Sequence, residues 1–277
     1  MRLSVSNIAW ENNELGSHLG LLKDLGCDGV EIAPSCIWNE PVEASKDQIM
    51  ELKELVERND LVIPAFHALL YTRPDYYLFG DETVRKITVD YLKKLIALAG
   101  ELSIKVLVYG SPKSRKVGDK PYEECYDTAV EVFKELGAAA QVHDACFCIE
   151  PLAASNTDFI QTADEGYRLV EDVGSEHFGL HLDARAMSES KEDYDDVFKR
   201  YGGVLKHFHV GDPSLAPPGT NGLDHTPIGK ALSGSGYDGF VSIEMRRGFG
   251  DTKKVIKDAV RYVREKYFSE KNTNERL

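Results

Sequence analysis

The chain has 277 residues, of which 42% are hydrophobic and 29% charged, a composition typical of globular proteins. The formal net charge of −13 argues against a nucleic-acid partner, because phosphate binding requires clustered lysine and arginine. No apolar run approaches the roughly 18 residues of a membrane helix, so no membrane partner is expected either.

The five cysteines are odd in number and form no C-x-x-C pair, which predicts reduced thiols in a cytoplasmic protein. The first residues already have a strand-like pattern and leave no room for a signal peptide. The length suits one α/β barrel of about 250 residues. We therefore expect one domain over residues 1–268 and a polar tail over residues 269–277.

Short apolar or β-branched runs alternate with amphipathic stretches along the chain. Eight strands are predicted at Leu3–Ile8, Gly29–Ile32, Leu61–Phe66, Lys105–Tyr109, Ala145–Glu150, Phe178–Asp183, Val204–Val210 and Gly239–Met245. The seventh unit is irregular, with a Pro/Gly-rich segment over 211–222 and a short helical possibility near Lys230. Eight such units without a second core predict a single (β/α)₈ barrel. The alternative is an open doubly wound sheet, which would carry a glycine-rich phosphate turn after Ile8, and none is present.

Four of the predicted strands end in a residue that can bind a divalent metal: Glu150, Asp183, His209 and Glu244. They are spaced by about one strand-plus-helix unit of roughly 30 residues, so they are expected at the same mouth of the barrel. Three converging carboxylates would repel one another unless a cation lay between them. Oxygen ligands with one imidazole suit manganese, magnesium, cobalt or zinc, so the sequence predicts one divalent metal ion here.

The segments around these residues are similar to the motifs of strands 5 to 8 in the xylose isomerase-like TIM-barrel superfamily. The resemblance is closest to its sugar phosphate isomerase/epimerase branch, which includes the ketose 3-epimerases. The segments are Cys148–Leu152, Leu180–Asp183, His207–Val210 and Ser242–Met245. The resemblance covers essentially the whole chain, and it implies a divalent ion, manganese first, on the four residues named above. It also implies that Glu150 and Glu244 act as acid and base on opposite faces of a sugar.

This assignment is consistent with elementary chemistry. A ketose held by a cation through its carbonyl and adjacent hydroxyl oxygens has a more acidic α-proton. Glu150 would remove that proton to give an enediolate, and Glu244 would return a proton to the other face. Burial is expected to shift the pKa of both carboxyl groups towards neutrality. The expected partner is a small carbohydrate, and the resemblance implies a homodimer or homotetramer.

The chain departs from the ketose 3-epimerase pattern at three positions. Ala186, Leu215 and Asn156 stand where those enzymes have a substrate-binding histidine, an arginine and an acidic residue. The substrate-binding residues predicted instead are His67, Lys113, Arg246 and His181. Both histidines have a structural alternative, as hydrogen-bonded groups of the core. Glu31 is expected to add a carboxylate, and His225 either to line the mouth or to cap the short seventh helix.

The leading hypothesis is a metal-dependent isomerase or epimerase of a sugar or sugar phosphate. The main alternative is a metal-dependent dehydratase of an inosose- or dehydroshikimate-like substrate, in which His67 or Lys113 could be the general acid. An apurinic endonuclease would need more histidines at strand ends and a basic face. A non-catalytic sugar-binding module would not need glutamates on two sides of a metal.

Overall fold

The computed structural model describes residues 1–268, and the predicted polar tail, 269–277, lies outside the described residues. The strands are β1 (Arg2–Ser6), β2 (Gly29–Glu31), β3 (Ala65–Phe66), β4 (Val106–Tyr109), β5 (Cys146–Ile149), β6 (Phe178–Asp183), β7 (Leu205–Val210) and β8 (Phe240–Ile243). All ladders are parallel, in the order β2-β1-β8-β7-β6-β5-β4-β3. Single bridges, Gly29 to Val62 and Ile32 to Phe66, join β2 to β3 and nearly close the barrel. The predicted (β/α)₈ barrel is confirmed.

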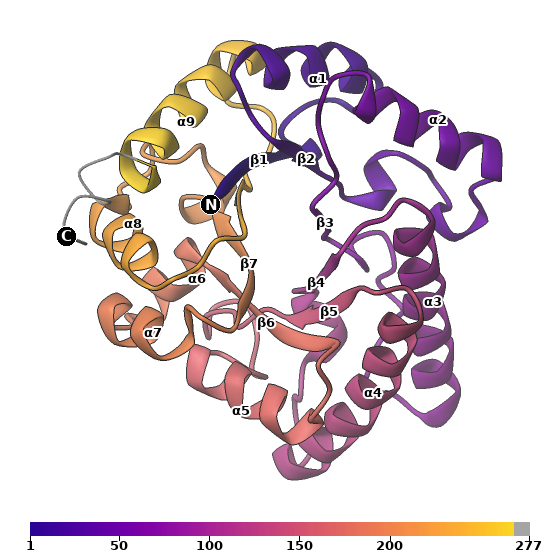
Figure 1. Ribbon diagram of the computed structural model, residues 1–277. Helices are drawn as coiled ribbons and strands as arrows, with labels where there is room; N and C mark the ends of the chain where they lie inside the picture. The colour runs from indigo at the N-terminus through magenta and orange to yellow at the C-terminus, as the bar shows by residue number, and fades with distance from the viewer. Residues whose placement is uncertain (269–277) are drawn as a thin grey trace.

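The helices form an outer ring around the strands (Figure 1). They are α1 (Leu15–Asp24), α2 (Lys46–Glu57), α3 (Glu82–Glu101), α4 (Tyr122–Val142), α5 (Ala163–Val173), α6 (Ala184–Glu189), α7 (Tyr194–Tyr201), α8 (His225–Gly234) and α9 (Thr252–Tyr267). Two of them, the short α6 and then α7, lie between β6 and β7. Within residues 1–268 no helix combines the length and the apolar character needed to cross a bilayer.

Four elements near the site or its loops differ from the predicted ones. β3 has only two residues, because Pro64 precedes it and has no backbone N–H to donate to a ladder. β5 and β8 end at Ile149 and Ile243, so Glu150 and Glu244 lie just past their strands. The structure also forms a ten-residue α8, with Asp224 as its N-cap, where the sequence indicated only a short helical possibility.

Polar side chains occupy much of the barrel interior. Outward-facing strand residues such as Leu180 and Phe208 belong to the main hydrophobic core with the helices. Only a small separate apolar cluster, which includes Val106 and Cys148, is formed by side chains of β3, β4 and β5. The fully buried polar residues of the strands and their ends include Ser4, Ser6, Glu31, His67, His181, Asp183, His207, His209 and Ser242. Barrel interiors are usually filled by branched apolar residues, so this polar filling marks a functional region.

Candidate active site

The register of the last three strands aligns the predicted metal ligands. Asp183 of β6 is the register partner of His209 of β7, and His209 in turn is the partner of Ser242 of β8. One step below, His181 pairs with His207. Because side chains alternate along a strand, these residues point to the same face of the sheet, the barrel interior. The site therefore has an upper layer at the mouth and a histidine layer beneath it.

Asp183 lies at a junction between strand and helix. β6 ends at this residue and α6 begins at the next, so Asp183 is the helix N-cap and its Oδ1 accepts a hydrogen bond from the N–H of Ala186 at 2.8 Å. The other carboxylate oxygen, Oδ2, is buried and has no hydrogen-bond partner within residues 1–268. An unpaired buried oxygen is costly, which indicates that a ligand belongs there.

His209 is held by one ring nitrogen and free at the other. Its Nε2 donates to Oε1 of Glu31 at 2.8 Å, whereas its Nδ1 is buried and has no partner in the described part of the chain. That Nδ1 lies 3.9 Å from Oε1 of Glu150 and 3.7 Å from Oε2 of Glu244. The free nitrogen thus faces the carboxylates of β5 and β8.

Glu31 determines this orientation from beneath. Its carboxylate is fully buried and also accepts hydrogen bonds from Nε2 of His207 at 3.1 Å and from the hydroxyl of Ser242. When the imidazole is neutral, as a metal ligand must be, accepting from Nε2–H leaves Nδ1 of His209 as the lone-pair nitrogen. A carboxylate that fixes the tautomer of a histidine in this way is the usual support of a metal-binding imidazole.

Small residues and a buried arginine position Glu150. A Cβ atom at Gly110, directly after β4, would lie 2.1 Å from Oε2 of Glu150, so only glycine leaves room for this carboxylate. The fully buried Arg115 donates from Nη2 to the backbone carbonyl of Glu150 at 2.6 Å. A Cβ atom at Gly211 would likewise lie 2.4 Å from the backbone carbonyl oxygen of Glu244.

The two glutamates have opposite pKa shifts. Burial raises the pKa of Glu150 to about 8, and the charges of Glu244 and Asp183 add to this effect. Burial also opposes ionisation of Glu244, but the charge of His209 and a hydrogen bond from His67 outweigh it and lower its pKa to about 2. The expectation that both pKa values shift towards neutrality is therefore wrong for Glu244, because His67 donates to it from Nδ1 at 3.2 Å.

The donor set fits a divalent cation. The ligand atoms of Asp183, His209 and Glu244 lie within 4.8 Å of one another, and those of Glu150, His181 and His209 form a second such group that shares His209. Atoms bound to one ion at about 2.1 Å stand roughly 3 to 4.3 Å apart, so the separations of 3.7 and 3.9 Å measured from His209 suit a common ion. The carboxylates also raise the pKa of His209 to about 10 against the effect of burial. The carboxylates of the cluster therefore stabilise a positive charge placed between them.

Two of the four predicted substrate-binding residues lie in this cluster. His67 contacts Glu244, and the hydroxyl of Ser6 donates to its Nε2 at 2.6 Å. His181 is fully buried, with Nε2 3.7 Å from Oε1 of Glu150 and with neither ring nitrogen hydrogen-bonded within residues 1–268. Both residues thus lie close to the predicted metal ligands, whereas their substrate contacts stay predictions.

The two predicted cations do not join the cluster. Lys113 is exposed on the short 3₁₀ helix Pro112–Arg115 after β4. Arg246 is also exposed, and it donates from Nε to the carbonyl of Ser214 at 3.2 Å while its guanidinium lies over the ring of Phe249. Binding of substrate by either residue also remains a prediction.

Two arginines that lie at the site are not among the predicted substrate-binding residues. Arg185 follows Asp183 by two residues, and its Nε is 3.7 Å from Oδ1 of that aspartate. Arg115 holds the backbone of Glu150, as described above. In the sequence, only their proximity to a strand end indicates that these arginines could lie at the site. Lys113 shares that proximity, so the sequence does not show that Arg115 is the buried residue of the two.

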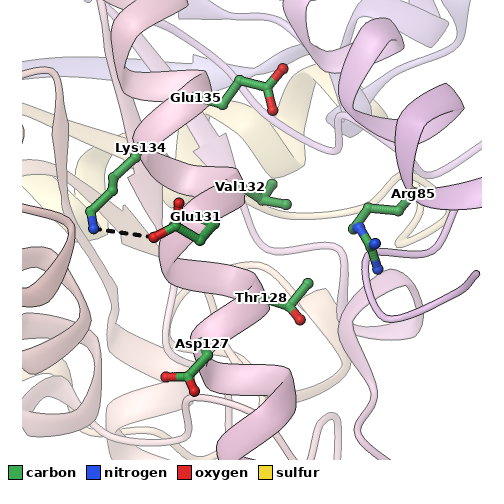
Figure 2. A pocket seen from close by; sticks show the side chains of 7 residues that line it. All are labelled: Arg85, Asp127, Thr128, Glu131, Val132, Lys134 and Glu135. Carbon is green, nitrogen blue, oxygen red and sulfur yellow. Dashed lines mark hydrogen bonds and ion pairs between the residues drawn. The ribbon is translucent and has the colours of Figure 1, made fainter. Parts of the chain in front are cut away.

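A surface groove lies elsewhere on the molecule. Figure 2 shows a groove between α3 and α4 on the outer wall, and it shares no residue with the cluster. Its lining consists of Arg85, Asp127, Thr128, Glu131, Val132, Lys134 and Glu135. These mixed charges include an ion pair between Lys134 and Glu131. The groove therefore has the character of a solvated helix surface.

Comparison with known families agrees with this architecture. The model of the xylose isomerase-like TIM barrel family matches residues 19–266. The chain belongs to this family, which confirms the resemblance seen in its strand-end motifs.

Two curated relatives are D-psicose 3-epimerases. The enzyme of Ruminiclostridium cellulolyticum is 29% identical over 244 residues, covering 84% of this chain and 80% of the relative. That of Enterocloster bolteae is 26% identical over 249 residues, covering 85% and 79%. Among solved structures, an L-ribulose 3-epimerase superposes with a TM-score of 0.85 at 19% identity, covering 99% of this chain and 97% of its own. The IOLI protein, solved with a bound zinc atom, has a TM-score of 0.80 at 20% identity, covering 98% and 99%. These structural likenesses concern the fold.

Proposed function

We propose that this protein is a divalent-metal-dependent sugar epimerase. The observation that carries the proposal is the set of Glu150, Asp183, His209 and Glu244 around buried atoms without partners, namely Nδ1 of His209 and Oδ2 of Asp183. The D-psicose 3-epimerases that cover more than four-fifths of the chain support the same reaction class.

In this proposal the four residues hold one ion, with manganese first and magnesium, cobalt or zinc as alternatives. The ion supplies Lewis acidity, which lowers the pKa of the proton next to the sugar carbonyl. The chain supplies the remaining functions. Glu31 orients His209, Gly110 leaves space for the carboxylate of Glu150, and burial of the cluster limits access of water.

Glu150 and Glu244 are the proposed acid and base. They follow β5 and β8, which are separated in the barrel by β6 and β7, so their carboxylates reach the centre from different sides. Such a pair suits epimerisation, in which a proton leaves one face of a carbon atom and returns on the other. His67 holds Glu244 in place, and His181 lies beside Glu150.

The test is proton exchange at carbon in deuterated water, monitored by NMR. Protein loaded with Mn²⁺ would be incubated with D-psicose, D-fructose, L-ribulose, ketose phosphates and inososes, and removed before the spectra are recorded. We expect deuterium next to the carbonyl together with a new epimer, and a loss of about 10³-fold in rate for both Glu150→Gln and Glu244→Gln. Loss of water to form an alkene or diketone would indicate the dehydratase instead. Exchange that persists in both variants would refute the acid/base pair.

A further inference from the structure

Arg185 is the only lysine or arginine among residues 1–268 that forms an ion pair with Glu150, Asp183 or Glu244. It lies in the first turn of α6, and 15% of its side chain is exposed. Its Nε is buried, 3.7 Å from Oδ1 of Asp183. Since β6 ends at Asp183, this guanidinium lies at the mouth of the barrel, beside the metal ligands.

The guanidinium donates no hydrogen bond to any residue in the described range, although it offers five N–H groups. Its natural partner on the helix would be Glu189, four residues on. That carboxylate instead accepts hydrogen bonds from Ser155 and Asn156 of the loop after β5, each at 3.3 Å. Buried donors rarely stay unpaired, so the planar fork of Arg185 is available for a ligand.

The balance of charge at the mouth of the barrel also supports a role for Arg185 in substrate binding. With all three ionised around one divalent ion, the carboxylates of Glu150, Asp183 and Glu244 would exceed its charge by one unit, and Arg185 supplies one positive charge. Lys113 and Arg246, the cations predicted from the sequence, are exposed and outside the cluster. Among the described residues, Arg185 is thus the cation placed to meet a substrate that enters over the metal ligands.

We propose that Arg185 is a substrate-binding residue whose guanidinium donates hydrogen bonds to two oxygen atoms of the sugar next to the reacting carbon. This inference rests on the proposed epimerase function and deepens it, because it assigns the polar recognition of the substrate to α6. The fork suits a pair of oxygen acceptors, and its charge favours oxygens on which negative charge develops as the proton leaves.

The experiment compares Arg185→Met, Arg185→Lys and a surface control, Arg261→Met, which lies on α9 with its side chain 77% exposed. Three quantities are measured for each protein: Mn²⁺ affinity by electron paramagnetic resonance, kcat/KM with D-psicose, and binding of glycolate to the Mn²⁺-loaded protein by calorimetry. Glycolate carries a hydroxyl beside a carboxylate, so it presents the oxygen pair without requiring turnover. Thermal unfolding is followed in parallel.

We expect Arg185→Met to lower both kcat/KM and glycolate affinity by about 10- to 100-fold, the loss of one or two charge-assisted hydrogen bonds. Arg185→Lys keeps the charge but loses the fork, so its values should fall in between. Mn²⁺ affinity should stay unchanged or rise, because a positive charge next to the cation is removed. The surface control should behave like the wild type.

Two results would overturn the inference. One is unchanged kcat/KM and glycolate binding in Arg185→Met. The other is a parallel fall in Mn²⁺ affinity and melting temperature, which would make Arg185 a structural partner of Asp183. If the wild-type protein turns over no ketose but still binds glycolate through Arg185, the proposed epimerase function fails while the role of Arg185 in binding stands.

Discussion

The barrel contains two buried clusters of histidine and carboxylate that differ in how their polar atoms are paired. In the first, at the mouth, Nδ1 of His209 and Oδ2 of Asp183 have no partner among residues 1–268. In the second, beside α8, His225 uses both ring nitrogens: Nε2 lies 2.8 Å from Oδ1 of Asp212, and Nδ1 2.7 Å from the hydroxyl of Tyr267. Asp212 also accepts hydrogen bonds from backbone N–H groups of the loop that follows it.

The difference separates the proposed binding site from a structural cluster. Both clusters contain the same residue types, and both are buried. The second is complete in itself and ties the irregular loop after β7 to α8 and α9. The first leaves donor atoms directed at a common centre. Neither sequence alternative for His225, at the barrel mouth or as a helix cap, is correct, since it is fully buried and Asp224 caps α8.

The largest contrast is expected from changing a proposed metal ligand. Asp183→Asn should weaken Mn²⁺ binding by at least about 100-fold, because loss of a supporting group alone costs 10- to 100-fold. The wild-type protein should gain about 2.7 kcal/mol of unfolding free energy at a metal concentration 100 times the Kd, and the variant should gain almost none. Titration with Mn²⁺ and thermal unfolding measure both. An equal gain in the two proteins would place the ion elsewhere.

A smaller effect is expected from changing a residue that supports a proposed metal ligand. Glu31→Gln replaces the acceptor shared by His207 and His209, so the tautomer of His209 is no longer fixed. Mn²⁺ affinity should fall by about 10- to 100-fold, with a fold that stays intact. Nitrogen NMR of labelled histidine reports the tautomer directly. If Nε2 of His209 keeps its proton and the affinity is unchanged, Glu31 does not position this ligand.

The second cluster should respond in stability and not in metal binding. Asp212→Asn leaves a donor of His225 or of the loop without its charged acceptor, at a cost of about 1–3 kcal/mol in unfolding free energy. Chemical denaturation measures this loss, and Mn²⁺ titration of the same protein should match the wild type. A clear drop in metal affinity would show that the two clusters are coupled.

The same aspartate predicts a pH dependence. Hydrogen bonds from His225 and from the N–H groups of Asn221 and Gly219 outweigh the effect of burial and lower the pKa of Asp212 in the folded state. A lowered pKa contributes stability above the unfolded value of about 4, and this contribution is lost as the pH falls through the folded value. The stability difference between the wild type and Asp212→Asn should therefore be full near neutrality and shrink below about pH 4. Denaturation curves across this pH range show whether the stability difference shrinks as the pH falls.

The fold and the convergence of the strand-end residues could be predicted because both depend on local pattern. Strand and helix periods specify the barrel, and a residue at a strand end is carried to the rim by the topology alone. Glu150, Asp183, His209 and Glu244 are of this kind. The apolar pattern predicts a longer β3 than the structure forms, because Pro64 lacks the backbone N–H that a longer strand would need.

The partners of each side chain could not be predicted in the same way. Whether His209 or His225 keeps a free nitrogen depends on residues far away in the chain, such as Glu31 and Tyr267. The pKa of Glu244 depends on His209 of β7 and on His67, the residue after β3, for the same reason. Lys113 and Arg185 both follow strand ends, and only the direction of each side chain distinguishes the exposed lysine from the arginine beside Asp183.

The central claim is that the incomplete cluster holds one divalent cation and the complete cluster holds none. Anomalous diffraction from crystals grown with Mn²⁺, recorded on both sides of the manganese absorption edge, tests it most directly. We expect one strong peak at bonding distance from Nδ1 of His209 and from carboxylate oxygens of Glu150, Asp183 and Glu244. A structure with no ion at His209, or with an ion between Asp212 and His225, would contradict this account.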